Sequence, residues 1–179
     1  MELKQLIMEM GHMALSSLVA ALSTFITGFI WYNPKVFGSA WMKAEGLTEE
    51  QLKKGNMAKI FGLSFVFAFI AGFAVIHPVV IHQFGAIGMI GAKDEVAKNS
   101  VSYKAFMDEF GTAYRTFKHG ALHGTLLGLL FVFPVIAING LYSHKPFKLT
   151  LITAGYWVVT LAIMGGIICG WSEKGFHFS

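Results

Sequence analysis

Long apolar runs without charged residues alternate along this chain with shorter stretches that carry the charges. Four of the runs reach the length of about 20 residues that a helix needs to cross the hydrocarbon core of a bilayer. They predict membrane spans at residues 12–32, 59–81, 119–141 and 149–171. Because backbone groups in lipid must find hydrogen-bond partners within the chain, each run should be helical. The predicted fold is all-α, an integral membrane four-helix bundle in a single transmembrane domain, residues 1–179.

The connections between the predicted spans contain two aromatic segments. After the first span, aromatic residues beside lysines follow the order W-Y-x-P-x-x-F-G-x-x-W-M, which predicts an interfacial segment. Between spans two and three, residues 93–118 place aromatic residues at helical spacing with charges between them and predict an amphipathic helix. Thr48 followed by Gln51 is a capping box, which predicts a short helix. The expected interface residues are Trp31, Tyr32, Pro34, Phe37, Gly38 and Trp41.

Small residues recur at every fourth position of the predicted spans, and Pro78 and Pro134 should kink the second and third span. The small-residue spacing puts a smooth stripe on each helix, so that neighbouring backbones can approach closely in lipid. A stripe could serve packing within the bundle or dimerisation of two copies. The expected packing residues of the last two spans are Gly120, Gly124, Gly128, Gly166 and Gly170.

Composition agrees with a membrane protein, since 55% of the residues are hydrophobic and only 13% are charged. Lys and Arg outnumber Asp and Glu by 14 to 10, an excess that in a membrane protein indicates anionic headgroups. The expected partner is therefore the lipid bilayer, and no nucleic acid is expected. Lys and Arg divide evenly between the two predicted membrane sides, so the positive-inside rule predicts no orientation.

Most of the histidines fall at one side of the predicted bundle. Spans of alternating direction bring the starts of spans one and three and the ends of spans two and four to the same membrane face. Since His119 and His123 are four residues apart on a helix, their imidazoles share a face. Neutral imidazole is a ligand for zinc, copper and haem iron, so a metal or haem site is one hypothesis. The candidate ligands are His119, His123, His77, His82 and His12.

Other uses of these histidines stay open. They could be boundary residues with one edge in the headgroups, or they could serve proton transfer or a quinone-type ligand. The span interiors hold no ionisable residue apart from the boundary histidines, which argues against an ion-coupled carrier. Nucleophile-elbow, P-loop, dinucleotide and H-E-x-x-H motifs are missing as well. The leading hypothesis is a non-catalytic structural or accessory component of a homo-oligomer or membrane complex, with a metal or haem protein and a small-solute carrier as alternatives; no cofactor is firmly implied.

Two blocks of sequence carry a family resemblance. One is "GFIWYNPKVFGSAWMKAEGLT" at residues 28–48, and the other runs from "HGALHGTLLGLLFVFPVIAINGLY" to "GYWVVTLAIMGGIICGW" at residues 119–171. In these blocks, roughly half of its length, the chain resembles a bacterial family of small integral membrane proteins of unknown function. The resemblance implies a multi-pass protein of the bacterial cytoplasmic (inner) membrane. It implies no reaction, substrate or cofactor, and residues 82–118 form a longer connection than the resemblance leads us to expect.

Overall fold

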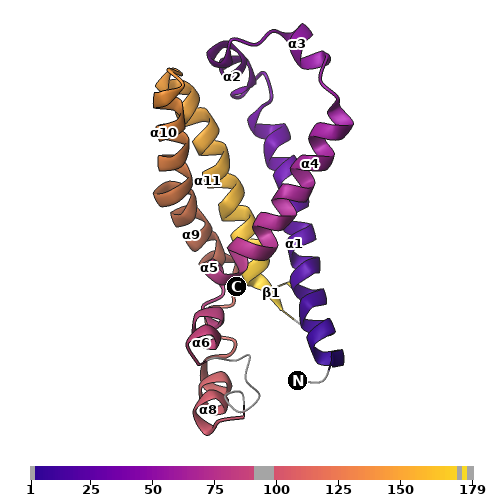
Figure 1. Ribbon diagram of the computed structural model, residues 1–179, viewed down its shortest axis with the longest axis vertical. Helices are drawn as coiled ribbons and strands as arrows, with labels where there is room; N and C mark the ends of the chain where they lie inside the picture. The colour runs from indigo at the N-terminus through magenta and orange to yellow at the C-terminus, as the bar shows by residue number, and fades with distance from the viewer. Residues whose placement is uncertain (1–2, 91–98, 173–174, 177–179) are drawn as a thin grey trace.

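The computed structural model describes residues 3–90, 99–172 and 175–176, and this part of the chain is almost entirely helical (Figure 1). Four helices are long and apolar enough to cross a membrane: Met10–Trp31, Met57–Val80, Phe117–Leu141 and Phe147–Gly170. The predicted all-α fold is therefore confirmed. In chain order the described elements are α1 (Leu3–Trp31), α2 (Gly38–Glu45), α3 (Glu49–Lys53), α4 (Met57–Ile70), the π-helical segment η1 (Ala71–Ile76), α5 (His77–Val80), α6 (Gln83–Ile90), α8 (Val101–Phe110), α9 (Phe117–Leu127), the π-helical segment η2 (Gly128–Val132), α10 (Phe133–Tyr142), α11 (Phe147–Gly170), β1 (Trp171–Ser172) and β2 (Gly175–Phe176).

The second and third spans each contain a π-helical segment just before their proline. Proline has no backbone N–H, and its ring crowds the carbonyl four residues earlier, so a regular α-helix cannot continue through it. Here His77 N–H bonds the Gly72 carbonyl, and Phe133 N–H bonds the Gly128 carbonyl, both with the five-residue spacing of a π-helix. The spans thus pass Pro78 and Pro134 with a wider turn.

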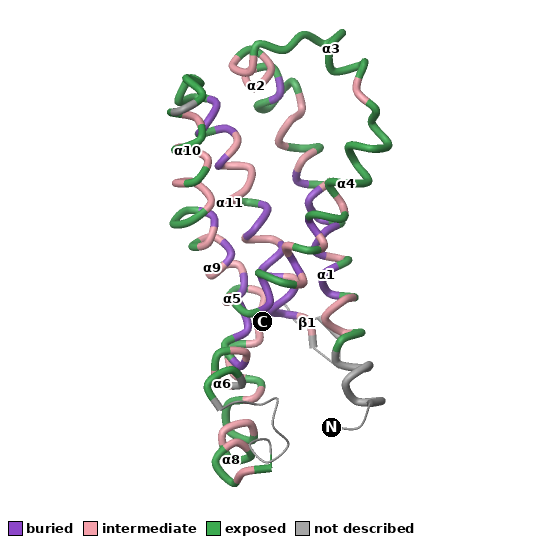
Figure 2. Tube along the Cα trace, viewed as in Figure 1, coloured by how far each residue is buried: buried purple, intermediate pink, exposed green. Residues whose placement is uncertain are grey.

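Helix α11 lies at the centre of the bundle. It packs against α9 and α10 on one side and against α1 on the other, while α4 lies against α1 (Figure 1). The buried cluster includes Ile76, Val80, Leu161, Met164 and Ile168 (Figure 2). The outward faces are apolar and exposed, as lipid-facing surfaces are.

Helices α9 and α11 approach each other closely, and this approach depends on glycine. A Cβ atom on Gly120 would collide with the Gly165 carbonyl, and one on Gly124 would collide with the Leu161 carbonyl. At Gly128 the nearest atom would be Val158 Cα at 2.7 Å. The stripe on α9 therefore allows backbone-to-backbone contact.

The facing surface of α11 includes a glycine that the spacing does not predict. Gly165 lies opposite Gly120 on α9. The expected Gly166 also faces α9, because a Cβ on it would meet the ring of Phe117 at 2.5 Å, and the expected Gly170 is buried at the end of the helix. The face of α11 that packs on α9 is therefore wider than the stripe that the sequence predicts.

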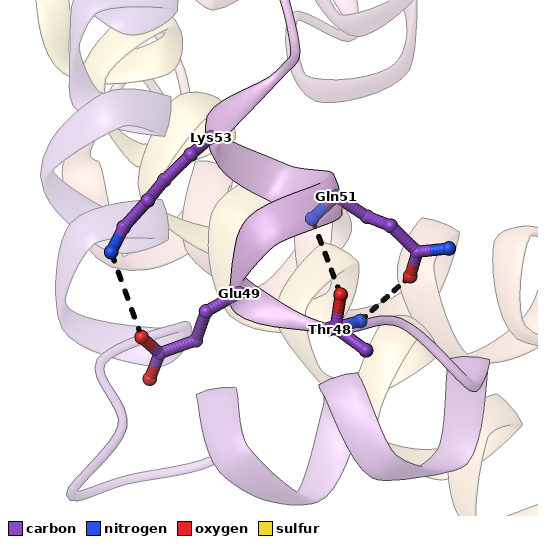
Figure 3. A network of polar contacts seen from close by, with 4 residues as sticks. All are labelled: Thr48, Glu49, Gln51 and Lys53. Atoms are coloured by element: carbon purple, nitrogen blue, oxygen red, sulfur yellow. Dashed lines mark hydrogen bonds and ion pairs between the residues drawn. The ribbon is translucent and has the colours of Figure 1, made fainter.

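Two of the connections lie at opposite ends of the bundle (Figure 1). Helices α2 and α3 follow α1, and the expected capping box is present, with Gln51 N–H donating to Thr48 Oγ1 and Thr48 N–H donating to Gln51 Oε1 (Figure 3). At the other end, α8 covers only part of the expected amphipathic stretch 93–118, of which residues 93–98 lie outside the described residues. The chain leaves the helix at Gly111, and Tyr114 has a left-handed φ of 61°.

Candidate metal centre

Three histidine side chains converge at the end of the bundle where α5 ends and α9 begins. Nε2 of His82 lies 3.2 Å from Nε2 of His123 and 3.3 Å from Nε2 of His119. One ring nitrogen from each of the three residues lies within 4.8 Å of the other two. His82 is exposed, and His119 and His123 are half-buried. This group, called here the three-histidine site, is therefore accessible from outside the bundle.

Local chain geometry explains why these rings meet. Helix α5 ends at Val80 and Ile81 is extended, which turns His82 away from the axis of the second span. On α9, the Thr116 side chain caps the helix by accepting a hydrogen bond from His119 N–H, so the first turn begins one residue later, at Phe117. His119 and His123 then lie one above the other on the same helix face. The sequence predicts this pair, and the break at Ile81 supplies the third ring.

The two close contacts of His82 Nε2 cannot both be in-line hydrogen bonds. An imidazole nitrogen carries either one N–H or one lone pair, so Nε2 of His82 can form one in-line hydrogen bond. It has two nitrogen neighbours at hydrogen-bonding distance. A cation among the three rings would engage all three lone pairs at once. Two nitrogens bound to one tetrahedral Zn²⁺ at about 2.05 Å lie about 3.3 Å apart, which matches both observed distances.

Neighbouring residues hold the loop that leads into α9. The ring of Tyr114 stacks on His119 with centroids 5.2 Å apart, and its left-handed backbone is a strained conformation for a bulky residue. Cys169 Sγ lies 3.3 Å from the carbonyl oxygens of both Val80 and Tyr114 and can donate to either. Cys169 thereby joins the end of α5 to the loop beside the site.

Arg115 fixes the same loop to the end of α11. Its Nε donates to the Cys169 carbonyl at 3.1 Å and its Nη2 donates to the Trp171 carbonyl at 2.5 Å. A cation at a helix C-terminus satisfies carbonyls that have no partner within the helix. Burial lowers the pKa of Arg115 from its ordinary value, because desolvation disfavours the charged form.

Gln83 ties the start of α6 to the end of α8. Its side-chain amide donates to the Phe110 carbonyl at 2.6 Å and to the Ala113 carbonyl at 3.1 Å. Because Gln83 directly follows His82, these two bonds restrict the segment that carries the third ring.

The structure does not bring the other two candidate ligands into the site. His77 is buried, with Nδ1 donating to the Gly72 carbonyl at 2.8 Å and Nε2 lying 3.3 Å from Ser16 Oγ. Its Nε2 faces Ser16 on α1 and the ring lies outside the group of three, so His77 serves the packing of α1 against the second span. His12 lies on α1 outside the group of three.

The expected interface residues lie at the opposite end of the bundle. Trp31 Nε1 donates to the Ile152 carbonyl at 3.0 Å, and the Trp31 ring packs on Phe37 at a centroid distance of 4.5 Å. Gly38 lies against the backbone of Tyr32, where a Cβ would collide with the carbonyl. Pro34 and Trp41 line a cavity there.

Sequence reasoning did not identify Tyr114, Arg115, Gln83 or Gly165 as site or packing residues. Tyr114 belongs to the aromatic stripe of residues 93–118, and this stripe predicts a helix there. Arg115 and Gln83 had no local signal, because their partners are carbonyl oxygens far away in the sequence.

Comparison with known protein families gives one match, over residues 15–169, to the family described as Protein of unknown function (DUF1761). The chain belongs to this family. The match extends from the first third of the first span to Cys169 and so contains all three histidines of the site. A search of the curated proteins and a search of the solved structures gave no match. This DUF1761 protein is thus a helical member of a family of unknown function, with four helices of membrane-spanning length.

Proposed function

We propose that this DUF1761 protein binds a divalent transition-metal ion through His82, His119 and His123 at one face of the membrane. The observation that carries the proposal is the placement of one Nε2 atom 3.2 and 3.3 Å from two others. One in-line hydrogen bond from His82 Nε2 serves only one of these two neighbours, whereas a bound ion engages both. Of the hypotheses raised by the sequence, a metal protein is therefore the one that the geometry favours.

The ligand set favours a late first-row ion. Imidazole nitrogen suits Zn²⁺ and Cu²⁺, and the affinity of such sites rises along the series to Cu²⁺. The site has no carboxylate ligand among the described residues, which argues against Mg²⁺ and Ca²⁺. Haem fits poorly, because two axial nitrogens lie on opposite faces of a macrocycle, whereas these three rings meet at one point.

The proposal also includes the membrane in which the protein lies. Four helices of spanning length support a multi-pass membrane protein. The resemblance of the sequence blocks to bacterial membrane proteins supports the bacterial inner membrane.

The test is the metal content of protein purified in detergent with a tag that contains no histidine. After incubation with Zn²⁺ and desalting, elemental analysis should find about one ion per chain. The metal content of the variant H82A/H119A/H123A should be lower by a factor of about ten or more, because removing all three ligands leaves no site. His144→Asn is the matched control, since His144 lies at the other end of the bundle with a left-handed φ of 51° that Asn tolerates.

Equal metal content in the wild-type protein and the triple variant would refute the proposal, as would a wild-type protein that retains neither Zn²⁺ nor Cu²⁺. Circular dichroism of the triple variant should match the wild-type spectrum, which shows that the loss of metal does not follow from unfolding. X-ray absorption of the Zn²⁺ form should show imidazole nitrogens at about 2.0–2.1 Å.

A further inference from the structure

A cavity of about 330 Å³ lies at the end of the bundle opposite the three-histidine site. It is formed by the residues that follow α1 together with α2 and α3, and its lining is mainly apolar. Tyr32, Pro34 and Trp41 line it on the side of the bundle, and Glu49, Leu52 and Lys53 line it on the side of α3. The volume falls in the range of small-ligand sites.

The aromatic wall of the cavity suits a cation. The rings of Tyr32 and Trp41 are 5.4 Å apart at an angle of 66°. Burial raises the pKa of Tyr32 to about 12, so the phenol stays neutral at physiological pH. The faces of neutral aromatic rings attract an ammonium group through their quadrupole, most strongly for tryptophan.

The α3 wall supplies one charge of each sign. Glu49 and Lys53 share a face of this helix, whose start is fixed by the capping box of Thr48 and Gln51 (Figure 3). Their side chains are 74% and 79% exposed and their charged atoms are 3.9 Å apart. A long, exposed pair of this kind is weak, so each charge can change its partner at little cost.

The cavity begins at the residue after Trp31, the last residue of the first span, and this places it at headgroup level. We propose that it binds the headgroup of a zwitterionic phospholipid with a primary ammonium. The ammonium lies between the Glu49 carboxylate and the rings of Tyr32 and Trp41, and the phosphate pairs with the Lys53 ammonium. A headgroup with both charges matches the lining better than an anionic headgroup, which would meet Glu49 unpaired.

The test measures lipid binding to the full chain by native mass spectrometry in detergent, with phosphatidylethanolamine and phosphatidylglycerol of identical acyl chains as the probes. The wild-type protein should bind phosphatidylethanolamine several-fold more tightly. Glu49→Gln should abolish this preference by weakening phosphatidylethanolamine alone, and Lys53→Gln should weaken both lipids. Each loss should be about twofold to fivefold, as expected for one exposed charge pair.

Glu50→Gln and Lys54→Gln are the matched controls, because these exposed residues have the same charges on the same short segment but do not line the cavity. Both should retain the wild-type preference. Tighter binding of phosphatidylglycerol, or equal losses in the Glu49 and Glu50 variants, would overturn the proposal. Trp41→Leu should reduce the preference without changing helix content, and an unchanged preference would contradict the aromatic part of the site.

Discussion

Replacing Gly124 by alanine tests the close contact of α9 with α11. The added Cβ would collide with the Leu161 carbonyl and would lie 3.1 Å from Ala162 Cα, and both of these are backbone atoms that cannot turn aside. Helix α9 must therefore move away from α11 along its most extensive contact. Overpacking of this kind costs about 1–3 kcal/mol. For a chain of this size, a loss of about 1–3 kcal/mol corresponds to a Tm lower by roughly 2–12 °C.

Thermal unfolding in detergent, followed by circular dichroism, measures this effect. Gly62→Ala is the control, because a Cβ at that position of α4 would meet no atom within 4 Å. Its Tm should be unchanged or slightly higher, since alanine favours the helix over glycine. Gly128→Ala should have an intermediate Tm, because its Cβ would lie 2.7 Å from Val158 Cα and must move by about 0.7 Å to reach the 3.4 Å of ordinary contact. If Gly124→Ala unfolds at the temperature of Gly62→Ala, the packing argument is refuted.

Three further predictions concern the ends of the bundle. A chelator should lower the Tm of the zinc-loaded wild-type protein by about 5–10 °C, which is the effect of removing an ion present at about 100 times its Kd. The Tm of H82A/H119A/H123A should not change. A wild-type Tm that does not respond to the chelator would contradict metal binding. Cys169 is completely buried, so maleimide should label it only after denaturation, and fast labelling of the native protein would show that α11 ends differently. Breaking the 2.7 Å ion pair of Lys145 with Glu45 by Lys145→Met should cost about 1 kcal/mol or less, because both side chains are partly exposed, and a larger fall in Tm would show that α2 depends on it.

The positions of the spans could be predicted from the sequence because they depend on charge-free length alone. Each helix of membrane-spanning length begins and ends within two residues of its predicted bounds. The capping box on α3 could be predicted for a similar reason, since all of its atoms belong to four consecutive residues.

The part that Gly165 plays in the packing of α11, and the choice of His82 over His77 and His12 as the third ring of the metal site, could not be predicted in this way. Which residues of α11 face α9 depends on the rotation of the two helices about their axes, which local spacing leaves free. The approach of His82 to His123 depends on the extended backbone of Ile81 and on the Cys169 contact with the Val80 carbonyl. A helix continued regularly through residue 82 would have pointed this ring elsewhere.

The loop of Tyr114 and Arg115 could not be predicted from the sequence for a third reason. The aromatic spacing around Tyr114 favours a helix, yet Arg115 forms two bonds to carbonyls at the end of α11. These tertiary contacts compete with local helix formation and hold Tyr114 in a left-handed conformation.

The π-helical segments before Pro78 and Pro134 also change the helical phase of their spans. A π-helical turn contains an additional residue, and one residue corresponds to a rotation of about 100° around an α-helix. On the third span, the side chains beyond Gly128 are therefore rotated relative to the glycine stripe before it. A helical wheel drawn through the whole span would assign its second half to the wrong neighbour. Deleting one residue within Gly128–Val132 would restore a single phase and turn α10 to a different face of the bundle.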